Sequence, residues 1–147
     1  MRDIKEMLKV HEGYRRRPYR CTKGKWTIGV GWNLNAHRPP EDIVAYLQEN
    51  GYITDEMIER LLDISLAAAI KDCQDAFPEF GSYTDGRKCA LIDMTFHMGE
   101  GIWNGETADL IRSGKWSQAA DRIKTHWLYA KQTPGRCQEN VSLLKEG

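Results

Sequence analysis

The sequence predicts an α+β fold that is mostly helical, with a small antiparallel sheet near the N-terminus. Apolar residues follow helical spacing over about the first twelve positions, alternate with a period of two from Tyr14 to Leu34, and return to helical spacing after Pro39. The 147 residues fit one domain, or two small lobes sharing a core, and 41% of them are hydrophobic, which is enough to bury a core.

The first predicted helix ends beside an acidic residue. Ile4, Leu8 and Glu12 are four residues apart, and Gly13 is suited to end the helix. Glu12 then faces the negative end of the helix dipole and aligns with apolar positions, so we expect its pKa to be raised. A carboxyl group that stays protonated is what a general acid requires. From the residues alone, a solvated or ion-paired glutamate is the competing interpretation.

Residues 14 to 34 predict the sheet. Pro18 indicates an edge strand, and Lys23-Gly24 is the expected turn. Glycines near Thr27 leave room for a ligand to approach the backbone, or they simply allow the sheet to bend. The second strand is expected to direct Trp26, Ile28, Val30, Trp32 and Leu34 to one face and Thr27, Gly29, Gly31 and Asn33 to the other.

Cys21 is a candidate thiolate at the end of this hairpin. Arg20, Lys23 and Lys25 surround it in sequence, and nearby positive charge lowers a thiol pKa. The competing interpretation is a half-buried small hydrophobic residue. A strict two-residue turn would direct Cys21 away from Thr27, whereas a longer loop or a bulge would bring both to one face, and the sequence leaves this register open.

The remainder predicts helices. One follows Pro39-Pro40 and runs to about Glu49, where Asn50-Gly51 is expected to end it. Thr54 is suited to N-cap a long helix that Pro78 stops. The segment 84–98 carries apolar residues on more than one stripe, so it should lie at the centre of the C-terminal core. Shorter helices are expected at about 107–112, 115–127 and 134–144.

The overall charge does not indicate a nucleic-acid-binding protein. Lys+Arg and Asp+Glu number 21 each, and no nucleic-acid motif is present. The four cysteines are widely spaced, so mostly reduced thiols are expected. His97 and His126 lie beside aromatic residues and are expected to pack, and no third ligand is spaced to form a metal site.

Four segments together resemble the phage-type lysozymes, the T-even-like endolysins of glycoside hydrolase family 24. The first is HEGYRRRPYRCTKGKWTIGVGWNL, which resembles the N-terminal signature of the family. The others are DMTFHMGEG, GKWSQAADRI and HWLYAKQTPGR, which resemble its central helix, its Trp-x-x-Ala-Ala helix and its Gln-Thr-Pro-x-Arg ending. They follow one another in the family's order and span almost the whole chain.

The resemblance implies a single lysozyme-like domain over 1–147, with a cleft between two lobes joined by the long helix. Residues from about 13 to 60 would form the β-containing N-terminal lobe. Residues from about 61 to 147, together with the helix at 1–12, would form the helical C-terminal lobe. It implies a muramidase that cleaves the β-1,4 bond between N-acetylmuramic acid and N-acetylglucosamine in bacterial peptidoglycan. The implied general acid is Glu12. Cys21 and Thr27 would complete the catalytic residues by positioning or activating water, and Cys21 stands in a position where most members carry aspartate. The implied substrate-binding residues are Gly31, Trp32, His97 and Arg136.

Three other functions are compatible with parts of this pattern. A lytic transglycosylase needs one acid and gives anhydro-muramyl products. A wall-binding module would keep a groove without turnover, and a cysteine peptidase or amidase would need Cys21 and a histidine but not Glu12. The basic run Arg15-Arg16-Arg17 fits a solvated strand face, or one attracted to anionic cell-wall polymers, better than an RNA site.

We further expect no cofactor, no nucleic-acid partner, no stable membrane insertion and a monomer. The N-terminus alternates charged and apolar residues without an apolar core, so no signal peptide is expected. The protein would then be made in the host cytoplasm and reach the wall after release, through a membrane pore.

Overall fold

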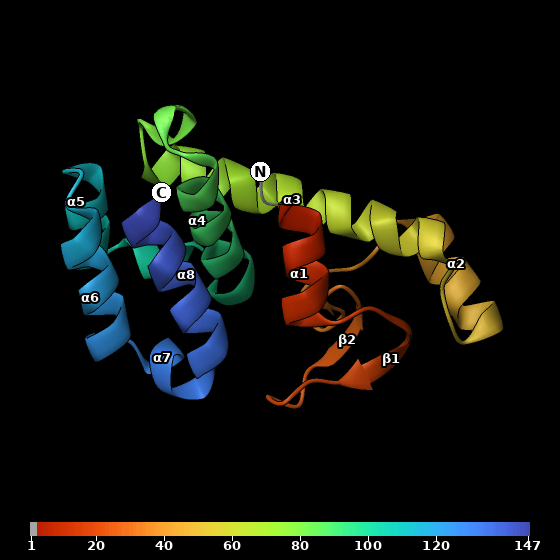
Figure 1. The fold of residues 1–147 in the computed structure, drawn as a ribbon. Helices are drawn as coiled ribbons and strands as arrows, with labels where there is room; N and C mark the ends of the chain where they lie inside the picture. Colours follow the sequence, from red (N-terminus) through yellow and green to blue (C-terminus); the bar gives the residue numbers. More distant parts are fainter. Residues whose placement is uncertain (1–2) are drawn as a thin grey trace. The chain divides into compact units, whose positions relative to one another are not determined.

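The computed structural model describes residues 3–147 and confirms the α+β class (Figure 1). The chain divides into two compact units, one formed by Lys5–Ala67 and the other by Ala68–Gly147 with the described residues before Lys5. We expected residues 1–12 to belong to the helical lobe, but α1 (Ile4–Glu12) falls almost entirely in the unit that contains the sheet. Within this unit, α1 forms ion pairs with α3 (Asp55–Ala76): Lys5 with Asp63, and Lys9 with Glu59 at 2.7 Å.

The sheet has three antiparallel strands in the order β1-β2-β3, with bounds Arg15–Arg20, Trp26–Gly29 and Trp32–Asn33. In Figure 1 the β1–β2 hairpin lies below α1, within the same unit. The predicted edge position of Pro18 is confirmed, because β1 pairs only with β2 in this sheet. The pairing register also shifts between Arg15 and Tyr19. Proline has no N–H for the ladder, so an irregular edge strand accommodates it.

The strand predicted to continue from Trp26 to Leu34 is not continuous. The chain reverses between β2 and β3, so that Ile28 lies opposite Trp32. Gly29 and Gly31 adopt φ values of 64° and 67°, which glycine reaches without the strain that a Cβ introduces. The two glycines therefore build a turn, which explains why the expected two-face alternation does not extend through it.

The helices of this unit begin and end as predicted. α2 (Glu41–Asn50) follows Pro39-Pro40, and Gly51 ends it in the left-handed conformation, with φ 77°. The Thr54 hydroxyl accepts a hydrogen bond from the Met57 N–H at 3.2 Å and so caps α3. The largest fully buried side chains here are aliphatic: Leu8, Ile28, Ile43, Ile53, Ile58, Leu61 and Leu62.

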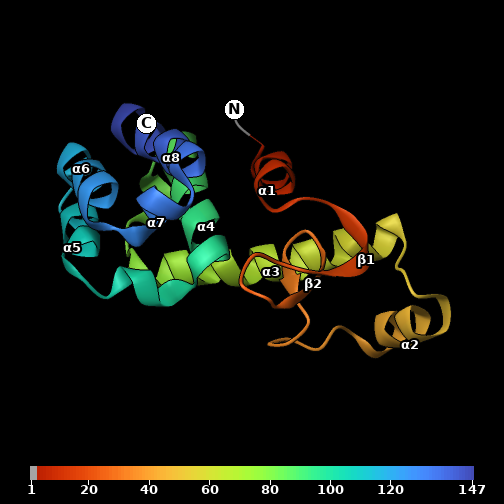
Figure 2. The same ribbon diagram turned by 90° about the horizontal axis from the view of Figure 1, so that it is seen from below.

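The second unit is helical. It contains the end of α3, then α4 (Asp85–Met98), α5 (Glu106–Arg112), α6 (Trp116–His126), α7 (Leu128–Gln132) and α8 (Pro134–Glu146), with 3-10 turns at Phe80–Ser82 and Glu100–Trp103. α8 packs against α4 and α6, as Figures 1 and 2 show. Seven consecutive residues of α4 are buried, as expected for the central helix. The sequence missed α7, which is too short to show a helical period. Over residues 3–147, no helix has both the length and the apolar character to cross a membrane.

Candidate active site

Glu12 lies at the end of α1, against the turn that joins β2 to β3. Gly13, with φ 87°, ends the helix, and its N–H donates to the Lys9 carbonyl at 3.0 Å. A Cβ added to Gly31 would lie 2.9 Å from Oε1 of Glu12 and 3.2 Å from its Cβ. The room that the sequence suggested for a ligand at Gly31 is therefore occupied by Glu12 itself.

The hairpin between β1 and β2 resolves the register that the sequence left open. The Cys21 N–H donates to the Lys25 carbonyl at 2.9 Å, and the Gly24 N–H donates to the Cys21 carbonyl at 2.8 Å. With Gly24 at φ 75°, this is a three-residue loop instead of a two-residue turn. Because Tyr19 lies opposite Thr27 and residues alternate between faces, Cys21 and Thr27 share one face of the sheet.

Thr27 is buried in the middle strand, with 5% of its surface exposed. It pairs with Tyr19 on one side and Asn33 on the other. Its hydroxyl donates to the Lys25 carbonyl at 3.0 Å. A hydroxyl has one proton, so a thiolate at Cys21 competes with that carbonyl for it, while the oxygen lone pairs can still accept from water.

The hairpin loop lowers the pKa of the Cys21 thiol. The largest causes are hydrogen bonds from the backbone amides of Lys25 and Lys23; burial opposes them, and the Thr27 hydroxyl adds to them. The sequence pointed to the charges of the basic side chains, whereas the loop backbone is the main source of the effect. Cys21 is half-buried, while the other three free thiols, Cys73, Cys89 and Cys137, are buried.

Tyr19 joins these residues, and the sequence interpretation did not assign it a role. Its phenol lies 3.5 Å from the Glu12 carbonyl oxygen. Burial raises the pKa of Tyr19, and the negative charges of Glu12 and Cys21 raise it further, while Arg15 lowers it. Both candidate catalytic side chains are therefore close enough to act on one phenol. Tyr19 lies two residues before Cys21, and residues two apart in a strand point to the same face, so this spacing was the sequence signal that links Tyr19 to Cys21.

Trp32 is a core residue of the sheet unit. Only 7% of its surface is exposed, and its Nε1–H donates to the His37 carbonyl at 3.0 Å. The ring also makes an edge contact with the His37 imidazole, with 6.2 Å between ring centroids. The structure thus gives Trp32 a packing role, and its contact with substrate remains a prediction.

Arg136 and His97 belong to the helical unit, where each packs against its own neighbours. Arg136 on α8 binds Asp93 on α4 through two hydrogen bonds, Nε to Oδ2 at 2.9 Å and Nη2 to Oδ1 at 3.0 Å. Asp93 is fully buried, and Asn140 donates to it at 2.8 Å. The half-buried His97 ring lies 5.7 Å from that of Tyr129 in an edge contact. Substrate contact by Arg136, His97 and Gly31 remains a prediction.

The predicted site residues therefore fall into two groups. Glu12, Cys21, Thr27 and Gly31 lie in the sheet unit, joined by Tyr19, whereas His97 and Arg136 lie in the helical unit. Across the described residues, 3–147, no three His, Cys, Asp or Glu side chains gather in a way that would hold a metal ion. The first group offers one carboxyl, one thiol and one hydroxyl, which are the groups needed to donate a proton and to direct a water molecule.

Comparison with known proteins identifies relatives over nearly the whole chain. The family model described as "Phage lysozyme" matches residues 9–140. Two curated proteins of Dictyostelium discoideum are similar: "Probable T4-type lysozyme 1", 28% identical, and "Probable T4-type lysozyme 2", 27% identical. Each alignment covers 98% of this chain and 94% of the relative.

Proposed function

Because the chain belongs to the phage lysozyme family and is therefore a glycoside hydrolase that acts on peptidoglycan, we propose that Glu12, Cys21 and Thr27 carry its reaction. The bond cleaved is the β-1,4 linkage between N-acetylmuramic acid and N-acetylglucosamine in the bacterial cell wall, which leads to lysis. The observation that carries the proposal is the hairpin register, which puts Cys21 and Thr27 on one face beside a tyrosine influenced by both Cys21 and Glu12.

Glu12 is the general acid in this proposal. Glu12 lies in the last turn of α1, at the negative end of the helix dipole, and this position supports a proton donor. Packing against Gly31 limits the positions open to the carboxyl group. As the glycosidic C–O bond breaks, the Glu12 proton passes to the leaving oxygen.

Cys21 and Thr27 handle the water. The Cys21 thiolate accepts a proton from water as the water oxygen bonds to the anomeric carbon, and the Thr27 hydroxyl orients the same molecule. An inverting glycosidase keeps about 6.5–9.5 Å between its acid and its base so that water fits between them. The lowered pKa of Cys21 supports a thiolate in the role that a carboxylate otherwise fills.

A lytic transglycosylase is the second candidate. One observation favours it: the segment from Gly13 to Pro40, which contains the whole sheet, has no Asp or Glu. Such an enzyme needs a single acid, because a hydroxyl of the sugar itself attacks the anomeric carbon. Its product is an anhydro-muramyl end, whereas hydrolysis gives a hydrated end.

Mass spectrometry of the soluble products from purified peptidoglycan distinguishes these functions. Wild type, Glu12→Gln and Cys21→Ala are digested in parallel. Hydrated muramic ends that disappear in Glu12→Gln and fall sharply in Cys21→Ala are the expected result. Anhydro ends that survive Cys21→Ala would replace the proposal with a transglycosylase. Fragmentation at the peptide stems that needs Cys21 but not Glu12 would replace it with a peptidase or amidase.

A further inference from the structure

Positive charge is concentrated in the part of the chain that forms the sheet. All seven charged residues from Gly13 to Pro40 are Arg or Lys, although the chain contains 21 residues of each sign. Four of the seven lie in β1: Arg15, Arg16, Arg17 and Arg20. The balanced net charge therefore hides a basic hairpin within a chain that is otherwise acidic.

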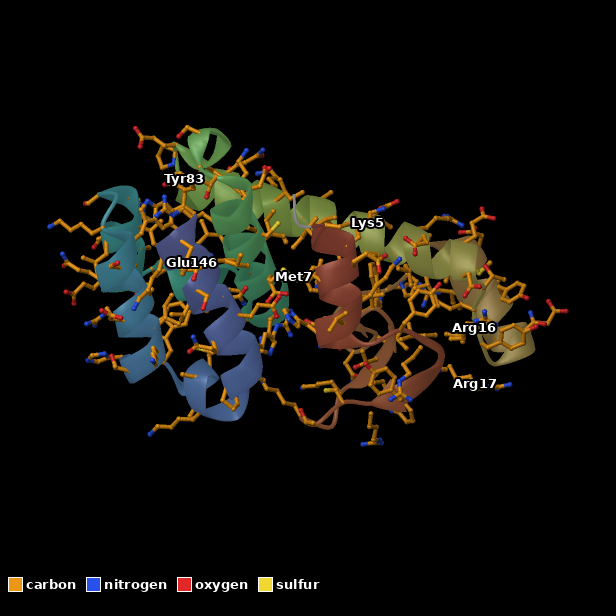
Figure 3. All side chains as sticks on the ribbon, viewed as in Figure 1. Lys5, Met7, Arg16, Arg17, Tyr83 and Glu146 are labelled. Carbon is orange, nitrogen blue, oxygen red and sulfur yellow. The ribbon has the colours of Figure 1, made fainter. Side chains whose placement is uncertain are left out.

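Two of these cations are neutralised by carboxylates. Arg16 binds Asp55 through two hydrogen bonds of 3.0 and 2.8 Å, and Arg38 binds Glu41 at 2.8 Å. Figure 3 shows Arg16 and Arg17 extending from β1 on the side of α2. The other five are Arg15, Arg17, Arg20, Lys23 and Lys25, and within the part of the chain that the structure describes no carboxylate pairs with any of them.

The outer end of the hairpin combines three of these cations with an exposed indole. Arg20 and Trp26 lie directly opposite each other in the ladder, and the Arg20 guanidinium is 4.9 Å from the centre of the Trp26 ring. Trp26 is 43% exposed, which is unusual for so large an apolar side chain. Lys23 and Lys25 are exposed beside them. We call Arg20, Lys23, Lys25 and Trp26 the hairpin-tip surface.

The central pair of this surface faces away from the candidate catalytic groups. Arg20 and Trp26 each precede by one residue a member of the Cys21–Thr27 face, and successive residues of a strand point to opposite faces. A ligand on Arg20 and Trp26 would therefore not occupy the water position proposed beside Cys21. Binding to Arg20 and Trp26 and turnover at the opposite face are therefore separable.

We propose that the hairpin-tip surface binds a phosphodiester polyanion attached to the bacterial wall, a polyol-phosphate chain with one negative charge per repeat. An arginine stacked on an aromatic ring is held in place while its edge N–H groups remain able to donate to phosphate oxygens. Two flexible lysines extend the positive surface along a repeating chain. The choice of a wall polymer over a nucleic acid rests on the proposed function, since the substrate defines which polyanion the enzyme meets.

Binding of the full-length protein to a labelled poly(glycerol phosphate) oligomer, followed by fluorescence anisotropy, tests the proposal. The triple variant Arg20→Gln, Lys23→Gln, Lys25→Gln should bind at least tenfold more weakly at about 50 mM salt, with a log–log salt slope smaller by about two to three. The matched control removes three exposed cations that are held in ion pairs with carboxylates: Arg60→Gln, Lys71→Gln and Lys145→Gln. It should weaken binding by less than about threefold, because its charges are already neutralised.

Trp26→Ala keeps every charge and should still weaken binding by about two- to fivefold, because Arg20 loses its stacking partner. Equal losses of oligomer binding in the two triple variants would show that the hairpin-tip surface is not the binding site. Full binding by both Trp26→Ala and the hairpin triple variant would show the same. Tighter binding to single-stranded DNA with the same number of phosphates would overturn the choice of partner. Melting temperatures show that each variant is folded. Parallel digestion of peptidoglycan stripped of phosphate polymers tests the muramidase reaction by itself, so that its failure is distinct from failure of binding.

Discussion

Glu12 and Gly31 lie in such close contact that position 31 cannot carry a side chain unless the carboxyl group moves. A Cβ there would come within 2.9 Å of Oε1 and 3.0 Å of Cδ of Glu12. The backbone at Gly31 also has φ 67°, which side-chain-bearing residues rarely adopt. A helix end and a turn nineteen positions later in the sequence thus hold one carboxyl group between them.

Gly31→Ala should therefore reduce turnover by about tenfold or more, since small displacements of a catalytic group have large effects on rate. The added methyl displaces the Glu12 carboxyl, and the left-handed backbone adds strain that costs about 1–2 kcal/mol of the free energy of unfolding. Release of soluble muropeptides and urea denaturation measure the two effects.

Gly51→Ala is the matched control. Gly51 has φ 77° in the same unit, but the nearest atom to its added Cβ is Nη1 of Arg17 at 3.7 Å, an ordinary contact. It should lose similar stability and keep its turnover. An equal loss of turnover in both variants would show that strain, and not the Glu12 contact, is responsible.

Cys21 should react with iodoacetamide as a thiolate at lower pH than an ordinary thiol. The loop amides lower its pKa, so the alkylation rate should reach half its maximum at a lower pH than for an unperturbed thiol. Stopped-time labelling with peptide mass spectrometry gives the rate for each cysteine. Cys73 provides the internal comparison, because burial raises its pKa to about 11.

Labelling of Cys21 should abolish peptidoglycan digestion in proportion to the labelled fraction, whereas Cys21→Asp should be active and insensitive to the reagent. Full activity after complete labelling of Cys21 would eliminate the thiol from the reaction.

The sequence predicted the helix ends and the edge strand well because their signals are local. Thr54, Gly51 and Pro18 each act within a few residues, through a cap, a left-handed backbone or a missing N–H. The strand 26–34 was predicted wrongly because its alternation of apolar residues passes unbroken through Gly29 and Gly31. Only the positive φ of those glycines, which the pattern does not show, reverses the chain.

The site was harder to predict for a related reason. Whether Cys21 and Thr27 share a face depends on one residue in the length of a loop, and composition does not determine that length. The contact of Glu12 with Gly31 joins two segments that are distant in sequence. The resemblance named Glu12, Cys21 and Thr27, but the role of the loop amides and the position of Tyr19 required the structure.

Thr27→Val should raise the pKa of Cys21 and lower turnover, because it removes the only side-chain hydroxyl among the groups that lower that pKa. The shape of the side chain is kept, and the lost bond to the Lys25 carbonyl costs about 1 kcal/mol of stability. Thiolate absorbance near the ultraviolet edge, followed against pH, measures the shift. Thr27→Ser keeps the hydroxyl and should leave the thiol pKa close to that of wild type. A shift of the same size in both variants would mean that packing, and not the hydroxyl, determines the thiol pKa.

Asp93→Asn should destabilise the protein by about 3 kcal/mol, because Asp93 is fully buried and Arg136 is 8% exposed. The carboxylate accepts two hydrogen bonds from Arg136 and one from Asn140, and an amide offers one acceptor and one donor in place of its two acceptors. Asp121→Asn is the matched control, since its ion pair with Lys145 is solvent-exposed and should be worth less than about 1 kcal/mol. Urea denaturation of both variants checks the difference. Equal midpoints would show that the Asp93–Arg136 pair does not hold α4 and α8 together.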